Sequence, residues 1–280
     1  MKKLTVFCAA ACLAASAAAQ NHPDLHEVLD RQKGRNLIEI PKGTYTLDVR
    51  NNGPYKFHNL TDVHINGNGS TVICNNQEQA FSFYNCVRVE LRDLTIDYDP
   101  LCFTQGEITA VAEDGSWFDV RIDEGDPVTG LAANRVQFYD PQTRLLKRNS
   151  ITTYTSNYSA LKQLGHNLFR AVKNGTWSAG EQVGDLVVMD VKPNAGVHTV
   201  MLNKCYNTKL ENVTVYGSNT FSFFEKEGYA NEYRNCVVDR GPMPQGIRPR
   251  LRSGNADGIH SSQARKGPTV TGCKVGHNGD

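Results

Sequence analysis

The sequence lacks a strong charge of either sign. Its 280 residues include 30 Lys or Arg and 29 Asp or Glu, which gives a formal net charge of +1 and an isoelectric point near 7.6. Proteins that bind nucleic acid or an anionic membrane surface usually carry a clear basic excess. The overall charge therefore indicates neither nucleic acid nor a membrane surface as the partner.

The chain also lacks long apolar runs after its first 20 residues. It begins with Lys2 and Lys3, the apolar stretch LTVFCAAACLAAS and the small residues SAAAQ. This order is typical of a secretory signal peptide, so we expect residues 1–19 to be removed near Ala19. The stretch is short for a membrane anchor, and no later segment could span a bilayer. We expect a secreted or periplasmic protein, with a lipoprotein anchored at Cys12 as the alternative.

Metal-binding spacing is absent as well. The eight histidines form no HxxxH or HExxH pattern, so the sequence favours neither a metal nor another cofactor. Hydrophobic residues make up 39% of the chain and charged residues 21%. That balance excludes a disordered polyelectrolyte and allows one large domain or two smaller ones.

Helix signals are few, and strands dominate. Only HPDLHEVLDRQK (22–33) and YSALKQLGHNLFRAVKNG (158–175) have a helical pattern. Elsewhere short β-branched runs are broken by Asn, Gly and Asp, which is typical of short strands joined by tight turns. We therefore expect an all-β protein.

An internal repeat organises these strands. NCVRVELRDLTIDY (85–98) aligns with KCYNTKLENVTVYG (204–217), so that Cys86 matches Cys205 and Leu91 matches Leu210. NLTDVHINGNG (59–69) fits the same frame, and YRNCVVDRG and VTGCKVGHNG repeat part of it. Such a unit buries its apolar face only when copies stack. With Asn-rich turns and short strands, the repeat favours a right-handed parallel β-helix.

Six cysteines follow the expected signal peptide. Four of them directly follow an Asn, Lys or Gly residue of the repeat: Cys86, Cys205, Cys236 and Cys273. If these four occupy the same place in successive rungs, they form a single row of buried thiols. Cys74 and Cys102 are less constrained by the repeat. Disulfides are the alternative, because export would permit them.

One region departs from the repeat. GEITAVAEDGSWFDVRIDEGDPV alternates with period two around the hairpin signal EDGS, and EQVGDLVVMDVKP resembles another strand. We expect a small antiparallel β-domain at 103–197, inserted between an N-terminal cap with the first rungs (20–102) and further rungs (198–280). IEIPKGTYTLDV resembles a capping strand pair. Trp117 and Trp177 in the inserted domain would either pack in its core or stack on a sugar.

Two aspartates are spaced by about one rung. Asp257 lies in SGNADGIHSS, and Asp280 lies 23 residues later in VGHNGD. A β-helix rung takes roughly 20–25 residues, so the two carboxylates would lie on adjacent rungs, about 5–9 Å apart. Glycosidases use carboxylate pairs at such separations. Two close carboxylates also raise the pKa of one of them, which suits a general acid beside a general base. Turn residues are the plain alternative for both.

The segment NADGIH, followed one rung later by GD, resembles the paired motifs of pectin-lyase-like β-helix glycosidases such as polygalacturonases. The chain most resembles bacterial alpha-1,3-galactosidases that act on blood-group-B-like glycans, also through LRDLTIDYDPLCFTQGEITAV and GDLVVM. This resemblance implies an inverting hydrolase with Asp257 and Asp280 as catalytic carboxylates. The family pattern has a second Asp directly after Gly-Asp and further rungs, so we expect this sequence to be a fragment.

Candidate substrate contacts surround Asp257. Between Arg234 and Lys266 there are seven basic residues and two acidic ones, which would suit an anionic sugar or a solvated loop. Within this segment Arg252 is nearest to Asp257 and is the strongest candidate. The other candidates are His260, His277 and Glu225, each of which is otherwise a surface or turn residue.

Three functions remain open. The first is a secreted glycosidase that takes a terminal α-galactoside or a related sugar without a metal. The second is a polysaccharide lyase or polygalacturonase-like enzyme acting on uronides, for which the arginine-rich loop would be used. The third is a non-catalytic glycan-binding β-helix.

Overall fold

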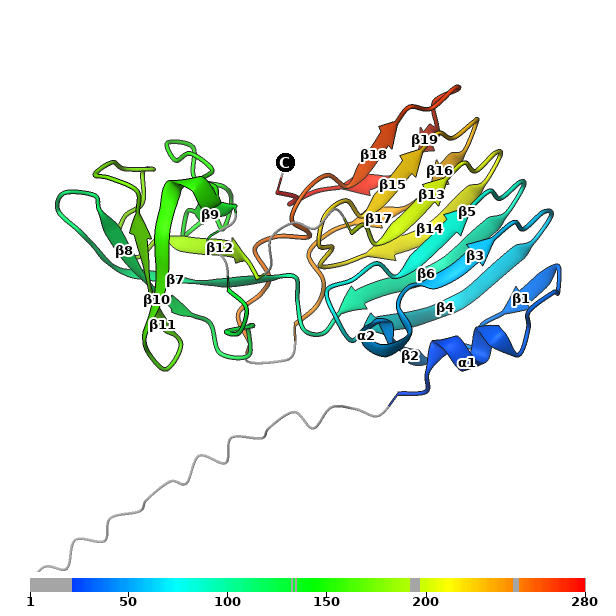
Figure 1. Cartoon of the computed structure of the whole chain (residues 1–280), viewed down its shortest axis with the longest axis horizontal. Coiled ribbons are helices and arrows are strands. Elements are labelled where there is room, and N and C mark those ends of the chain that lie inside the picture. The colour runs from blue at the N-terminus through cyan, green and yellow to red at the C-terminus, as the bar shows by residue number, and fades with distance from the viewer. Residues whose placement is uncertain (1–21, 132, 134, 192–196, 244–246, 280) are drawn as a thin grey trace, which may run out of the picture.

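Three sheets make up most of the described chain. The computed structural model describes residues 22–131, 133, 135–191, 197–243 and 247–279, so the expected signal peptide and Asp280 lie outside the described residues. The fold is all-β with two parallel sheets and one antiparallel sheet (Figure 1). Among these residues the helices are short: α1 (Leu25–Asp30), α2 (Val49–Asn52) and the 3-10 turn η1 (Thr155–Asn157).

The larger parallel sheet has nine strands, of which six follow the order β1-β4-β6-β14-β16-β19. Its strands are β1 (Leu37–Glu39), β2 (Thr44–Leu47), β4 (His64–Cys74), β6 (Glu90–Tyr98), β14 (Lys209–Val215), β16 (Glu232–Arg234), β17 (Val237–Val238), β19 (Thr269–Thr271) and β20 (Lys274–Val275). The expected capping strands β1 and β2 both pair with β4 rather than with each other.

The smaller parallel sheet has five strands in the order β18-β15-β13-β5-β3. These are β3 (Tyr55–His58), β5 (Phe81–Tyr84), β13 (Val200–Asn203), β15 (Phe223–Lys226) and β18 (Ile259–Ser262). The chain alternates between the two parallel sheets, and we call each passage through both a circuit. Each new circuit lays its strands beside those of the preceding one (Figure 1).

The strand register confirms the principal repeat. Leu210 pairs with Leu91, Val213 with Leu94 and Val215 with Ile96, as the alignment predicts. The chain bends within each circuit at Asn or Asp residues with positive φ of 52–55°: Asn68, Asp93, Asn212 and Asn235. Asn and Asp tolerate this left-handed conformation better than most residues, which explains why they punctuate the repeat.

The predicted single row of cysteines is wrong, because the structure contains two separate pairs. Cys86 and Cys205 precede Val87 and Tyr206, which bridge each other at the corner between the sheets. Cys236 and Cys273 instead precede Val237 and Lys274, which pair at the later bend. Asn85 and Asn235 both precede a cysteine and both have positive φ, so the Asn-Cys dipeptide looks alike at two different places. None of the six described cysteines forms a disulfide with another of them.

The apolar core lies between the two parallel sheets. Inward-facing side chains such as Leu91, Leu210 and Phe223 are at most 1% exposed, and Leu25 and Leu29 of α1 belong to the same core. Asp24 caps α1 by accepting a hydrogen bond from the backbone N–H of His26 at 3.0 Å. The helix predicted at 22–33 is therefore confirmed, though it is shorter than its pattern.

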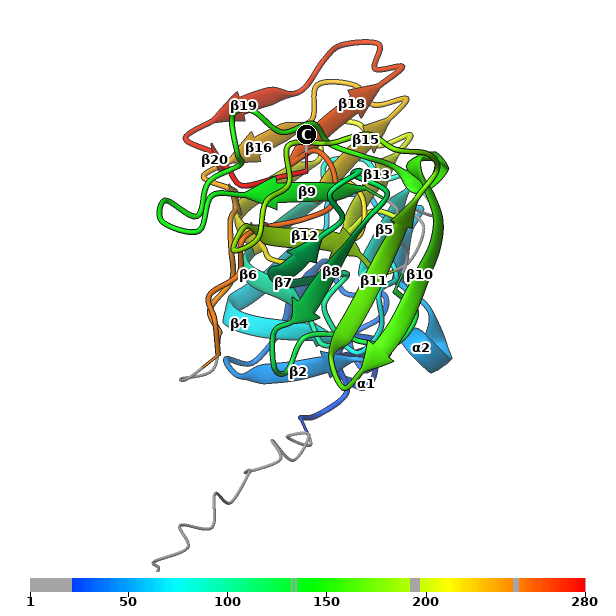
Figure 2. The same cartoon turned by 90° about the vertical axis from the view of Figure 1, so that its left-hand side faces the viewer.

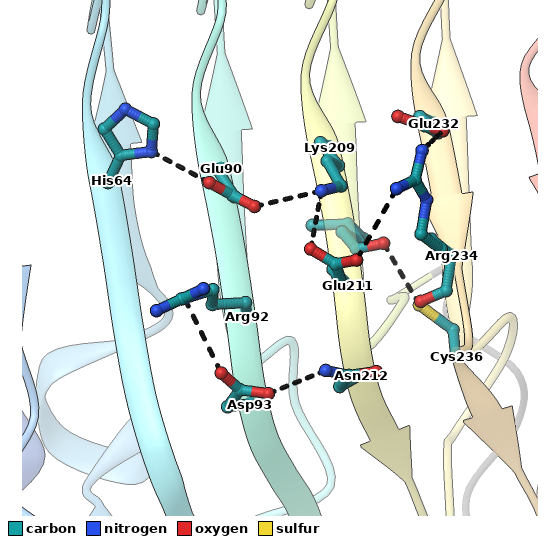
Figure 3. A network of polar contacts seen from close by, with 11 residues as sticks. His64, Glu90, Arg92, Asp93, Lys209, Glu211, Asn212, Glu232, Arg234 and Cys236 are labelled. Carbon is teal, nitrogen blue, oxygen red and sulfur yellow. Dashed lines mark hydrogen bonds and ion pairs between the residues drawn. The ribbon is translucent and has the colours of Figure 1, made fainter.

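The outer face of the nine-stranded sheet is solvated and carries alternating charges. Figure 3 shows His64, Glu90 and Lys209 on three neighbouring strands, with Nδ1 of His64 2.8 Å from Glu90 and Nζ of Lys209 3.2 Å from it. Lys209 also contacts Glu211 at 2.5 Å. Pairs of this kind at a surface contribute little individually, and they indicate a face that meets water.

The antiparallel sheet forms a separate lobe, which Figure 2 shows from its outer side. Its order is β10-β11-β8-β7-β12-β9, from β7 (Phe103–Val111), β8 (Trp117–Ile122), β9 (Val136–Tyr139), β10 (Tyr158–Gly165), β11 (Leu168–Lys173) and β12 (Leu186–Asp190). Strands β7 and β8 pair antiparallel on either side of EDGS, which confirms the predicted hairpin. The domain boundaries stay a prediction.

The helix predicted at 158–175 is wrong, because this segment is the hairpin β10–β11. Along β11 the burial alternates strictly between half-buried and buried positions, so the pattern has period two. Gly165 ends β10, and Asn167 has a positive φ of 53°, so the chain reverses there. The pairing of β11 with β8 outweighs the helix propensity of Leu, Lys and Gln.

No helix among the described residues is long and apolar enough to cross a membrane.

Candidate functional site

Asp257 lies just before β18, which is the last strand of the five-stranded sheet in chain order. Its backbone carbonyl accepts from the N–H of Ser222 at 3.1 Å, and that of Gly258 accepts from Phe223 at 2.9 Å. A Cβ at Gly258 would come within 2.3 Å of the Val275 side chain, so only glycine fits there without a shift. These contacts hold the Asp257 backbone against the preceding circuit.

The Asp257 carboxylate is paired with an imidazole. Nδ1 of His260 lies 2.6 Å from Oδ2 of Asp257, and the two side chains are 38% and 32% exposed. The carboxylate is thus reachable by a ligand while one of its oxygens is oriented. A positioned carboxylate of this kind can transfer a proton or activate a water molecule.

A row of aromatic rings adjoins this pair. The Phe221 ring stacks on His260 at 4.2 Å between centroids and on His198 at 4.8 Å, and Phe224 lies against both histidines. Burial, helped by the nearby His260, lowers the pKa of His198 to about 4. His198 is therefore neutral at physiological pH, and its Nδ1 is buried without a hydrogen-bond partner.

Asp280 lies outside the described residues, so its separation from Asp257 stays a prediction. Its neighbourhood is described as far as Gly279. Gly254 bridges Asn278, a separation of 24 residues, close to the 23 residues between the two aspartates. The N–H of Ser253 donates to the carbonyl of His277 at 2.8 Å. The segments that precede the two aspartates therefore lie side by side.

Arg252 is fully buried. Its Nη2 donates to Asp190 at 2.5 Å and to the side chain of Asn255 at 2.6 Å, and Nη1 donates to Gln137 at 3.1 Å. In this structure Arg252 fixes the segment before Asp257 to the antiparallel domain. Its expected contact with substrate stays a prediction.

Gln137 of β9 joins the two segments. Its Nε2 donates to the carbonyl of Gly279 at 2.9 Å, while its Oε1 accepts from Arg252. The Asn255 amide donates to the carbonyl of Cys102 at 3.1 Å. The antiparallel domain thus contacts the Arg252 side chain before Asp257 and the Gly279 backbone before Asp280. We call Gln137, Asp190, Arg252 and Asn255 the buried clamp.

Two other arginines of the loop before Asp257, Arg248 and Arg250, also pair with carboxylates of this chain. Nη1 of Arg250 donates to Asp97 at 2.8 Å and Nη2 at 3.0 Å. Arg248 lies 3.2 Å from Asp123 and 3.3 Å from Glu107. The loop runs between the antiparallel domain and the parallel sheets (Figure 1), and its arginines tie it to both.

The remaining predicted contacts lie in different environments. Glu225 points into the core of the parallel sheets at 0% exposure, and neither carboxylate oxygen has a hydrogen-bond partner of ordinary geometry. Burial raises its pKa, and the Asn231 amide opposes this only in part. His277 is half-buried, with Nε2 3.9 Å from Asp239, and burial lowers its pKa. The structure therefore brings His260 to Asp257 but directs Glu225 inward.

Sequence reasoning missed the residues that hold Asp257 in place. Gln137 and Asp190 belong to the antiparallel domain, 115 and 62 residues before Arg252. No local pattern marks them. A buried polar residue within an otherwise apolar strand, such as Gln137 in VQFY, was the one available signal.

No group of three or more His, Cys, Asp or Glu in the described ranges could hold a metal ion.

Comparison with known proteins leaves the family open. No family model matches the sequence, and no curated protein matches it. Among solved structures, the chain is similar to the tailspike protein gp49 from Pseudomonas phage LKA1, with a TM-score of 0.24 and 12% identity. The match covers 80% of this chain and 46% of the tailspike chain, so this chain spans under half of that protein. Similarity at this level does not assign a family.

Proposed function

We propose that this chain is a glycoside hydrolase that removes terminal α-linked galactose, or a related sugar, from glycans by inversion. The observation that carries the proposal is the half-exposed Asp257 carboxylate, oriented by His260 at 2.6 Å and preceded by a segment that the buried clamp fixes. A carboxylate that acts on a glycosidic bond needs both access and a fixed position.

Two further features support the proposal. The motifs NADGIH and GD resemble those of alpha-1,3-galactosidases and polygalacturonases. The alternation of the chain between two parallel sheets, with Asn bends at equivalent places, suits a right-handed parallel β-helix. Asp280 would supply the second carboxyl group of an inverting pair, and neither member is assigned as the acid or the base.

The lyase alternative has less support. It relied on arginines near Asp257 that could bind a uronate or abstract a proton. Arg248, Arg250 and Arg252 each pair with carboxylates of this chain, and Arg252 is fully buried. With the expected signal peptide, the protein would meet its substrate outside the cytoplasm.

The proposal is tested by incubating the protein with a terminal α-1,3-galactoside and measuring free galactose. Asp257→Asn should lower the rate by about 10²–10⁴-fold, the usual contribution of general acid–base catalysis. Its melting temperature should stay nearly unchanged, because Asn keeps the size of the side chain. Asp62→Asn, at an exposed corner with positive φ, is the matched control and should keep full activity.

Two results would count against the hydrolase. One is a folded protein that releases no sugar from neutral α-galactosides or from uronides. The other is an Asp257→Asn variant that turns substrate over at the rate of the unsubstituted protein. A large loss of melting temperature in that variant would instead favour a structural turn role for Asp257.

A further inference from the structure

The antiparallel domain contains a cavity that the proposed reaction does not use. Its volume is about 300 Å³, and it is lined by hairpin residues 111–115 together with Trp177, Ser178 and Glu181. Small-molecule sites usually begin at about this volume, which suits a single sugar ring. The cavity lies between the β7–β8 hairpin and the segment that follows β11.

Trp177 is held rigidly at this cavity. Its indole Nε1 donates to the carbonyl of Asn174 at 3.1 Å, so the polar edge of the ring already has a partner. Nζ of Lys173 lies 4.6 Å from the ring centroid and donates to the Trp177 carbonyl at 2.8 Å. Lys173 is itself paired with the buried Glu181. A fixed aromatic ring loses little freedom when a ligand stacks on it.

The opposite wall is equally constrained. Gly115 has a φ of +72°, and a Cβ there would lie 2.7 Å from the carbonyl oxygen of Trp177. Only glycine therefore allows the hairpin tip to approach the tryptophan so closely. Oδ1 of Asp114 accepts from the N–H of Ser116 at 3.0 Å, which fixes the turn.

The lining suits a neutral sugar. Aromatic rings stack on the apolar C–H faces of sugars, and carboxylates and hydroxyls bind sugar hydroxyl groups. The rim carries the exposed carboxylates of Glu113 and Asp114. Hydrogen bonds from Ser116 lower the pKa of Asp114, so that it is ionised at neutral pH. Two anionic groups at the rim disfavour a uronate, because like charges repel.

We propose that the cavity beside Trp177 is a second carbohydrate site, which binds one neutral pyranose residue of a glycan. This inference rests on the proposed function in one respect, the expectation that the ligand is a glycan. Both tryptophans have a cation near the ring, the Arg170 guanidinium at 3.5 Å from Trp117 and Nζ of Lys173 at 4.6 Å from Trp177, but only Trp177 lines the cavity. A sugar in the cavity would therefore stack at Trp177 and not at Trp117.

The chain has two tryptophans, so fluorescence can report on this cavity alone. In a Trp117→Phe variant, Trp177 is the sole tryptophan, and D-galactose should change its emission with saturation. A Kd on the order of 1–10 mM is typical for a ligand of this size. Galacturonate should bind at least about tenfold more weakly, because of the two rim carboxylates.

Substitutions at the cavity separate the possible outcomes. Calorimetry with D-galactose should show about tenfold or greater loss of affinity in Trp177→Ala. The exposed double variant Glu113→Gln/Asp114→Asn provides a second test that does not depend on the folding of Trp177→Ala, since it should bind galacturonate about as well as galactose. Asp257→Asn should leave the Trp177 signal unchanged, so loss of hydrolysis and loss of this site are distinguishable.

The inference is overturned if the Trp177 emission does not respond to 50 mM galactose (about five times the weakest Kd expected). It is also overturned if Trp177→Ala folds and binds galactose as the unsubstituted chain does. Equal affinity of the unsubstituted chain for galactose and galacturonate would overturn its preference for a neutral sugar.

Discussion

The side-chain amide of Gln137 donates a hydrogen bond to the backbone carbonyl of Gly279 at 2.9 Å. The same amide accepts from Arg252, so one residue of the antiparallel domain binds the segments before both Asp257 and Asp280. The domain is therefore part of the support of the candidate site, although none of its residues contributes a candidate catalytic group.

Gln137→Met should loosen this support without emptying the space that the side chain fills. Losing one buried hydrogen-bond partner costs about 1–3 kcal/mol, which corresponds to roughly 5–150-fold faster local opening. Hydrogen exchange should accelerate at the amides of Ser253 and Asn255, and kcat should fall more than KM changes. Gln142→Met, at an exposed position of the same domain, is the control. Unchanged exchange at both amides would remove Gln137 from this role.

Removing one partner of the Arg252–Asp190 pair should lower the free energy of unfolding more than replacing both. Arg252→Leu leaves Asp190 buried without its guanidinium, and such losses cost about 3–5 kcal/mol. Arg252→Leu/Asp190→Leu should recover part of this stability. Urea denaturation of the two single variants and the double variant measures the coupling. Strictly additive effects would show that the pair does not act as a unit.

Asp126 should destabilise the protein as the pH rises. Burial, with the neighbouring Asp123 carboxylate, raises its pKa to about 7. A raised folded-state pKa of an acid means that the stability present at low pH is lost between about pH 4 and 7. Asp126→Asn should therefore be more stable than the unsubstituted chain at pH 8, by about 1–4 kcal/mol, and the gain should shrink towards pH 4.

The control for this pH dependence has the opposite sign. Hydrogen bonds from Thr143 and Gln142 lower the pKa of the half-buried Asp140. Asp140→Asn should therefore reduce stability at neutral pH and have less effect in acid. Thermal denaturation between pH 4 and 8 compares both variants. A gain for Asp126→Asn that does not vary with pH would exclude titration as its cause.

Glu225 should behave as a buried neutral acid. Because burial raises its pKa, ionisation opposes folding, and stability is lost as the pH rises above the usual range of a glutamate. Glu225→Gln should stabilise the fold by about 1–2 kcal/mol at pH 8 and leave galactose release unchanged. Urea midpoints at pH 4 and 8 provide the measurement. Loss of activity with no gain in stability would instead support the predicted contact with substrate.

The repeat could be predicted well because its apolar positions recur in register. Leu91 and Leu210 occupy the same place in successive circuits, and this spacing is visible in the sequence. The single row of cysteines was predicted wrongly for a physical reason. Asn85 and Asn235 both take a left-handed conformation before a cysteine, but they lie at different bends of the circuit. The helix at 158–175 was predicted wrongly because the pairing of β11 with β8, and not the composition of the segment, makes it a hairpin.

The candidate site could be predicted only in part. Asp257 lies just before β18 and His260 lies within it, three residues later, so their proximity follows from local sequence. The contact of Arg252 with Gln137 spans 115 residues and depends on how two domains pack. Glu225 precedes a turn, but the alternation of β15 directs it into the core. A shift of one residue along a strand moves every side chain to the other face of the sheet. A short apolar run does not show which of its residues face the core.

The antiparallel domain leaves the parallel sheets and returns to them at nearly one point. The N–H of Val191 donates to the carbonyl of Cys102 at 3.1 Å, and Tyr98 donates to Thr199 at 3.0 Å across the same junction. Another domain whose first and last residues lie equally close together could be inserted at this junction without changing how the strands of the circuits pair. The whole antiparallel domain can therefore be exchanged as one cassette between these two ends, which would replace Gln137 and its contacts with Arg252 and Gly279 while the pairing of the circuits stays the same.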